Sequence, residues 1–210
     1  MKAKLLWLLV PFALWGCQDE AAEGKATAAS MTELPAYTEQ YVPNPQVSDD
    51  RRLQERGQQT RDAKGSLELL AANMEPTVVQ VGDIELTIHE AKLLHYAPDH
   101  SVIDFYRSYT HDAEFQLAKF FIEMRNTSSE RVKFAPVALM ETENGEVKTW
   151  KDEVYLEALN EGLAPGEVKS GNIGFIVGGE TGELKLTTSN LLSENGHPLA
   201  QAATIRVLLR

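Results

Sequence analysis

The stretch from Phe115 to Thr127, FQLAKFFIEMRNT, constrains the fold more than any other part of the sequence. Its apolar side chains occupy alternate positions, at Ala118, Phe120, Ile122 and Met124, and charged side chains stand between them, at Lys119, Glu123 and Arg125. A period of two is typical of a β-strand with one buried and one solvated face. We therefore expect the central strand of an antiparallel β-sandwich here, with Phe120 and Ile122 in its core.

Further strand and turn signals follow residue 76. Val78 to Ile88 contains Gly82-Asp83, which predicts a strand pair or a kinked strand, and the apolar phase shifts near Glu90, which predicts a β-bulge. Asn144-Gly145 predicts a hairpin, because both residues tolerate positive φ. Roughly seven to nine short strands separated by turns favour an all-β, immunoglobulin-like antiparallel sandwich over residues 76–210, which we expect to fold without the preceding segments.

Charge and cysteine content narrow the function classes. The chain of 210 residues has a formal net charge of −11, with 31 acidic and 20 basic side chains. Binding to nucleic acid requires a basic surface, so the composition argues against a nucleic-acid partner and against charge-driven adhesion to anionic lipid. Cys17 is the one cysteine in the sequence, so no disulfide within the chain can support the fold.

The N-terminus has the pattern of an export signal. Lys2 and Lys4 precede a short apolar run, LLWLLVPFAL, and Leu14-Trp15-Gly16-Cys17 follows it. Placing the cysteine after Leu-x-Gly resembles the lipobox of bacterial lipoproteins. The resemblance implies a signal peptide at 1–16, diacylglycerol on Cys17, and an extracytoplasmic protein held at the cell membrane by its N-terminal lipid. The alternative is an ordinary secretory signal with a cysteine nearby.

Residues 17–75 are interpreted as a linker between the lipid and the folded domain. The first part is rich in Ala, Glu, Ser and Thr with spaced prolines, and shows no sustained period, which is typical of a disordered spacer. Ser48-Asp49-Asp50 matches a helix start, and a thin leucine stripe follows it. We therefore predict a marginal helix near 48–73.

The order of scaffold residues supports a family resemblance. Phe115-x-x-Ala118…Met124-Arg125-Asn126-Thr127, the Asn144-Gly145 hairpin and Leu163-Ala164-Pro165-Gly166-Glu167…Gly171-x-Ile173-x-Phe175 occur in this order. Together they resemble the telokin-like immunoglobulin-fold domain of Gram-positive surface lipoproteins, over about residues 76 to 190. The resemblance implies the fold and an extracytoplasmic location, and it brings no catalytic residues.

The long connection from residue 96 to residue 112 is the candidate recognition surface. Aromatic side chains and arginine dominate many protein interfaces because they bury large areas with little rotamer loss. The candidate partner-binding residues are Tyr96, Phe105, Tyr106, Arg107 and Tyr109. The alternative is that the connection folds back as a flap and that its aromatic side chains fill one end of the core.

Motifs for catalysis are absent from the sequence: it has no HExxH, GxSxG or Walker loop. His95, His100 and His111 are weak candidates for zinc or copper ligands, with aspartates near them. We expect a non-enzymatic module without a cofactor, which binds a protein or peptide ligand at the cell envelope. A metal-handling lipoprotein that uses these loop histidines is the alternative. An enzyme, which would need a pocket that gathers a nucleophile and a base, is the third hypothesis.

Overall fold

The computed structural model describes residues 33–210 of the protein. Cys17, the predicted signal peptide at 1–16 and the first part of the predicted linker lie outside the described residues. The described chain is almost entirely β-structure, with short helical turns at η1 (Ala36–Thr38), α1 (Ile103–Tyr106) and η2 (Trp150–Asp152). No helix among residues 33–210 is long and apolar enough to cross a membrane.

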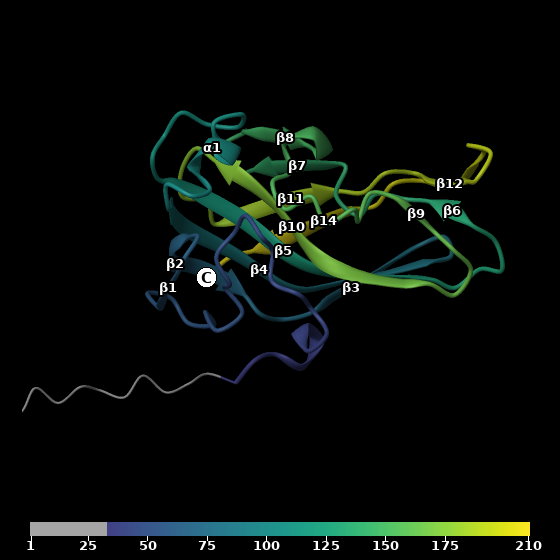
Figure 1. Cartoon of the computed structure of the whole chain (residues 1–210). Helices are drawn as coiled ribbons and strands as arrows, with labels where there is room; N and C mark the ends of the chain where they lie inside the picture. The colour runs from purple at the N-terminus through teal and green to yellow at the C-terminus, as the bar shows by residue number, and fades with distance from the viewer. Residues whose placement is uncertain (1–32) are drawn as a thin grey trace, which may run out of the picture. The chain divides into compact units, whose positions relative to one another are not determined.

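A six-stranded antiparallel sheet organises the fold (Figure 1). Its strands are β1 (Gln59–Asp62), β2 (Gly65–Asn73), β3 (Thr77–Val81), β4 (Ile84–Pro98), β5 (Phe115–Asn126) and β10 (Val168–Val177). The order is β1-β2-β4-β5-β10, with β3 beside β4. The alternating stretch is therefore an interior strand, as predicted: β5 pairs with β4 on one side and with β10 on the other.

Two smaller antiparallel sheets form the second layer. One has the order β14-β11-β7-β8 and the other β13-β12-β6-β9. The strands of the first are β7 (Leu139–Thr142), β8 (Val147–Thr149), β11 (Glu183–Thr187) and β14 (Thr204–Leu208). Those of the second are β6 (Val132–Lys133), β9 (Gly162–Leu163), β12 (Leu191–Ser193) and β13 (Pro198–Ala200). The all-β antiparallel sandwich expected from the sequence is confirmed.

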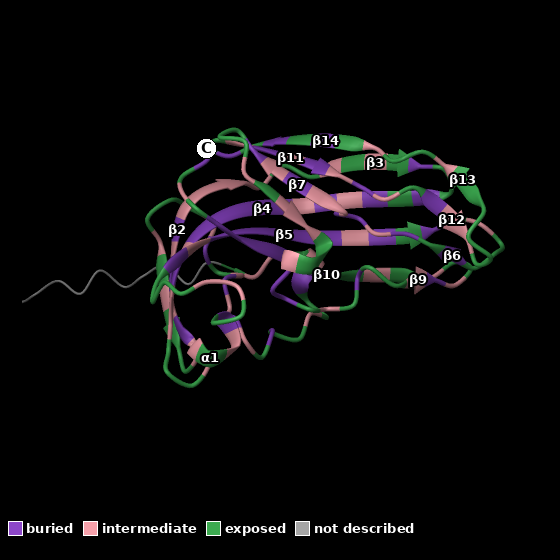
Figure 2. Ribbon diagram, turned by 90° about the horizontal axis from the view of Figure 1, so that it is seen from above, coloured by how far each residue is buried: buried purple, intermediate pink, exposed green. Residues whose placement is uncertain are grey.

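The main core lies between the six-stranded sheet and the second layer. Phe120 and Ile122 of β5 are fully buried there, with Phe175 of β10 and Leu186 of β11. Figure 2 shows the buried stretches concentrated on β4 and β5. The bulge predicted near Glu90 is present as a register shift between Ile88 and Glu90 in the β4–β5 pairing. Its effect is that the apolar side chains on both sides of it face the same core.

Hairpins occur where the turn residues predicted them. Residues Thr142 and Val147 flank the Asn144-Gly145 turn between β7 and β8. Gly145 alone of the pair has positive φ, at 83°. Gly82 has a φ of 57° at the first position of the two-residue β3–β4 turn, which fits a type II′ hairpin. A side chain there would also meet Leu191 at 2.9 Å, so the turn requires glycine for conformation and for space.

The predicted helix near 48–73 and the domain boundary at 76 are corrected by the structure. Residues 59–73 form β1 and β2, and Leu67 and Leu69 alternate into a second apolar cluster. Residues 33–57, which we call the strap, cross the face of the six-stranded sheet away from the second layer (Figure 1). Val47 and Leu53 of the strap are buried in that second cluster. The folded unit therefore includes much of what the sequence presented as a linker.

Candidate functional site

The connection between β4 and β5 is built around buried tyrosines. Tyr96 and Tyr106 are both fully buried, and their rings meet edge to face at a centroid distance of 5.5 Å. Their hydroxyls donate to the carbonyl oxygen of Gln46, at 3.1 and 3.0 Å. Burial raises the pKa of Tyr96 to about 12. These two candidate partner-binding residues are therefore core residues that hold the strap, in agreement with the alternative interpretation.

The other three candidates lie nearer the surface. Phe105 is half-buried and packs edge to face on Tyr106 at 5.0 Å between centroids. Arg107, the C-cap residue of α1, is exposed, and its Nε donates to Asp104 of that helix at 2.9 Å. Tyr109 is half-buried and lines a pocket. Among the five predicted residues, Tyr109 is thus placed at a concave site.

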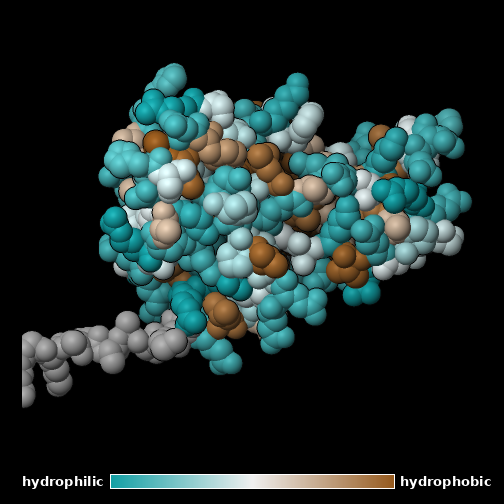
Figure 3. All heavy atoms as spheres, in the orientation of Figure 1, coloured by the Kyte–Doolittle hydropathy of each residue, from teal (hydrophilic) through white to brown (hydrophobic). Residues whose placement is uncertain are grey.

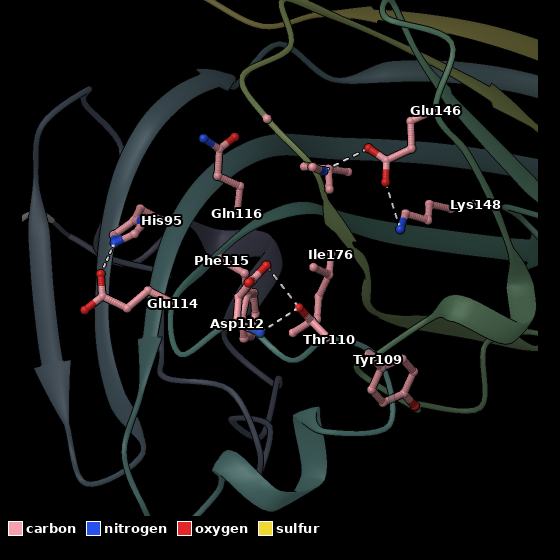
Figure 4. Close-up of a pocket in the computed structure, with 13 residues that line it drawn as sticks. His95, Tyr109, Thr110, Asp112, Glu114, Phe115, Gln116, Glu146, Lys148 and Ile176 are labelled. Atoms are coloured by element: carbon pink, nitrogen blue, oxygen red, sulfur yellow. Dashed lines mark hydrogen bonds and ion pairs between the residues drawn. The ribbon is translucent and has the colours of Figure 1, made fainter.

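This pocket has a volume of about 400 Å³ and lies where β5 begins and β10 ends (Figure 4). The residues that line it are His95, Tyr109, Thr110, Asp112, Glu114, Phe115, Gln116, Glu146, Lys148, Ile176, Val177, Gly178 and Gly179. They come from β4, the connection before β5, the start of β5, the β7–β8 hairpin and the end of β10 with the two glycines after it. A second hollow of about 330 Å³ shares Tyr109, Lys148 and Ile176 with it.

Two ion pairs stand on opposite sides of the pocket (Figure 4). On one side, His95 Nε2 lies 3.1 Å from Glu114. On the other, Lys148 Nζ lies 2.8 Å from Glu146, which also accepts the N–H of Gly178 at 2.9 Å. Burial acts to raise the pKa of Glu146, but the Gly178 N–H and the Lys148 charge outweigh it and lower this pKa below its usual range. Glu146 is therefore a fixed carboxylate that ties the hairpin to β10.

Gln116 provides the unusual feature of the pocket. Its Oε1 is buried and has no hydrogen-bond partner. A buried carbonyl oxygen without a donor costs roughly 1–3 kcal/mol, so such an atom calls for an explanation. Because Gln116 lines the pocket, a bound molecule with an N–H or O–H group could supply the missing donor. The pocket is therefore suited to a polar ligand.

The loop histidines do not form a cluster of possible metal ligands in the described residues. His95 pairs with Glu114, while His100 and His111 make no ion pair within residues 33–210. Nowhere in this described range do three His, Cys, Asp or Glu side chains lie close enough together to hold a metal ion.

Sequence reasoning missed a cluster of buried charges beneath the strap. Asp50, Glu90, Lys92 and Lys119 are at most 5% exposed. Lys92 and Lys119 each lie 2.9 Å from Asp50, and Lys92 lies 3.0 Å from Glu90. Lys119 also bonds to Glu90. We call these four residues the ionic cluster. Its two positive and two negative groups compensate one another, which is the condition for burying charge.

The ionic cluster joins the strap to the sheet. Asp50 belongs to the strap, whereas the other three charges project from β4 and β5. Burial acts to raise the pKa of Asp50, but the attraction of Lys119 and Lys92 outweighs burial, so this pKa lies well below its usual range. The pKa of Lys119 is correspondingly raised by Asp50 and Glu90 against the opposing effect of burial. Both groups are therefore charged at neutral pH.

Tyrosines of the strap extend this contact. The hydroxyl of Tyr37 donates to Glu90 at 2.7 Å, and its ring stacks on His89 at 4.6 Å between centroids. The hydroxyl of Tyr41 donates to Glu157 at 2.6 Å. Burial, together with the neighbouring carboxylates, raises the pKa of both tyrosines far above the usual value. Tyr37 and Tyr41 are thus neutral donors that satisfy carboxylates.

The fold and the sites define a class: an all-β sandwich with a polar pocket at one end of its main sheet and a charge-locked N-terminal strap. The chain is 35% identical to the uncharacterized protein YdhF of Bacillus subtilis (strain 168) over a 234-residue alignment that covers 99% of each chain. It belongs to the family of YdhF. No protein-family model matches the sequence.

Two solved structures are similar to part of the chain. A functionally unknown protein from Listeria monocytogenes EGD-e has a TM-score of 0.48 at 10% identity, covering 59% of this chain and 76% of that one. A conserved hypothetical protein from Bacillus anthracis has a TM-score of 0.35 at 14% identity, covering 67% and 99%. Neither similarity is close enough to transfer a function.

Proposed function

We propose that this chain is a lipid-anchored, extracytoplasmic lipoprotein and that its sandwich is a non-enzymatic binding module with a telokin-like immunoglobulin fold. Leu14-Trp15-Gly16-Cys17 after a short apolar run supports the anchor, and the single thiol defines where lipid would attach. The ligand would be an envelope protein or peptide, because the pocket offers a mixture of acidic, basic and amide groups.

The observation that carries the binding role is the unpartnered Oε1 of Gln116. In the proposed complex, an N–H or O–H group of the ligand donates to this oxygen. Tyr109, which lines both the pocket and the neighbouring second hollow, packs against the bound group. Backbone amides of a peptide are donors of the required kind. Figure 3 shows that this face of the molecule is mainly hydrophilic, with separate apolar areas.

The anchor is tested by metabolic labelling with a tagged fatty acid. Cells that express the full chain should incorporate the label, and cells that express Cys17→Ala should not, because the variant has no thiol to acylate. Equal labelling of the two proteins would exclude lipidation at this residue.

The pocket is tested by comparing envelope proteins that cross-link to the full chain and to Gln116→Leu. Leucine has a similar volume and cannot accept a hydrogen bond, so a partner that uses Oε1 should be lost, with about a tenfold or greater fall in recovery. Gln116→Glu keeps the acceptor and is the matched control. If Gln116→Leu recovers the same partners in the same amounts, the pocket is not the binding site.

A further inference from the structure

The strand β3 lies at an edge of the six-stranded sheet. In the described chain it pairs with β4 alone, with Val81 opposite Ile84 and Thr77 opposite Ile88. Val78 is 63% exposed, and Gln80 is exposed as well. Within residues 33–210, no strand pairs with the outer side of β3.

The hairpin geometry fixes which backbone groups face outward. A two-residue turn makes Val81 and Ile84 a hydrogen-bonded pair, and hydrogen-bonded and non-bonded pairs then alternate along the ladder. Val79 and Thr77 thus bond to β4, whereas the N–H and C=O groups of Val78 and Gln80 point away from it. No backbone hydrogen bond to another part of residues 33–210 uses these outward groups.

Other edge strands of the described chain are protected against pairing. Natural proteins protect sheet edges with charged residues, proline, short strands or bulges. β1 carries Arg61 and Asp62, β14 carries Arg206, β8 carries Lys148 and β13 begins at Pro198. β9 has two residues. Each of these edges therefore discourages the addition of a strand.

The edge of β10 is capped by carboxylates. Glu157 accepts the N–H of Asn172 at 2.7 Å, and Glu153 accepts the N–H of Gly174 at 3.2 Å. The N–H of Val154 bonds to the carbonyl oxygen of Gly174 at 2.9 Å. β3, with the sequence TVVQV, has no charge, no proline and no cap of this kind. Its residues also favour extended structure.

Charge distinguishes between the possible occupants of this edge. Glu75 lies just before β3 and Asp83 lies in the turn after it, and both are exposed. Antiparallel pairing with a second copy about Val79 would place Asp83 of that copy opposite Glu75, and each copy carries a net charge of −11. Like-charged surfaces repel, whereas a basic segment would be attracted.

We propose that β3 is a docking edge to which an extended, basic segment of another protein adds as a further strand. Backbone bonds to Val78 and Gln80 provide the affinity, and lysine or arginine near Glu75 and Asp83, which flank β3, selects the partner. The docking edge and the Gln116 pocket are formed by different residues. An experiment can therefore contradict one proposal and leave the other standing.

The test uses the full chain and a short synthetic peptide of alternating valine and threonine with lysine at both ends. Amide hydrogen exchange is followed by NMR. The peptide should slow exchange at Val78 and Gln80 by about tenfold or more and leave Val79, which is already bonded to β4, nearly unchanged. The same peptide with glutamate at both ends should bind at least about tenfold more weakly.

Gln80→Pro removes one outward N–H without removing a bond to β4 and should weaken peptide binding about tenfold or more. Gln80→Thr retains the N–H and is the matched control, and thermal melts of both variants report folding. Equal binding by Gln80→Pro, no protection of Val78 and Gln80, or equal binding of the glutamate peptide would each overturn the proposal. Protection that rises with protein concentration in the absence of peptide would overturn it in favour of pairing between copies.

Discussion

Lys119 shows how a single residue can break a correct pattern. The alternation along β5 predicts it on a solvated face, yet it is fully buried and bonded to Asp50 and Glu90. The period of two is correct, since Lys119 does lie on the face opposite Phe120. The expected exposure is wrong because the strap covers that face, and Asp50 lies 69 positions earlier in the sequence.

Asp50→Asn should destabilise the fold by about 3–5 kcal/mol, because it leaves the buried Lys92 and Lys119 with Glu90 as their one remaining negative partner. Urea unfolding measures this loss. Asp49→Asn is the matched control: Asp49 is partly exposed and pairs with Arg51, so its loss should cost about 1 kcal/mol or less. Similar costs for the two variants would contradict the ionic cluster as described.

The low pKa of Asp50 predicts a dependence of stability on pH. Its folded-state pKa lies below the unfolded value of about 3.9, so the stabilisation by the carboxylate is fully present above that pH. It is lost as the pH falls through the folded-state pKa. The difference in unfolding free energy between the natural chain and Asp50→Asn should therefore be constant from about pH 7 to about pH 5 and shrink below about pH 4. A difference that grows on acidification would reverse the assigned sign.

Among the elements, β5 is the one whose packing the sequence predicts best. Phe120 is fully buried between the main sheet and the second layer. Phe120→Ala should cost about 3–5 kcal/mol, because it removes a large apolar side chain from a packed core. Chemical denaturation measures it, and Val78→Ala, at an exposed position, should change stability by less than about 1 kcal/mol.

The strap and β2 are the elements whose structure the sequence pattern does not reveal. Leu67 and Leu69 do alternate with polar residues in β2. An alternation of only two apolar residues, close to Gly65 and among polar side chains, is too short to identify a strand from the sequence. The sequence likewise predicts only part of the candidate site. Tyr109 and His95 could be selected by residue type, but Gln116 and Lys148 meet them through strand pairing that joins distant segments. Such pairing leaves no local signal.

At the scale of the whole molecule, residues 76–210 should not fold alone, contrary to the expectation from the sequence. That fragment lacks the strap, β1 and β2, and it exposes Leu94, Leu117 and the unpaired charges of β4 and β5. A chain of residues 33–210 should show a cooperative melt, and a chain of residues 76–210 should not. Calorimetry compares the two; cooperative melting of the shorter chain at a similar temperature would show that the strap is dispensable.

The strap also determines when folding can be completed, because some of its partners lie far along the chain. Tyr41 bonds to Glu157, 116 positions later, so a segment made early must wait for one made late. Val47, Leu53 and the carboxylate of Asp50 likewise lack a binding surface until β4 and β5 have formed. The strap, although it is made early, is thus among the last of the described segments to reach its place.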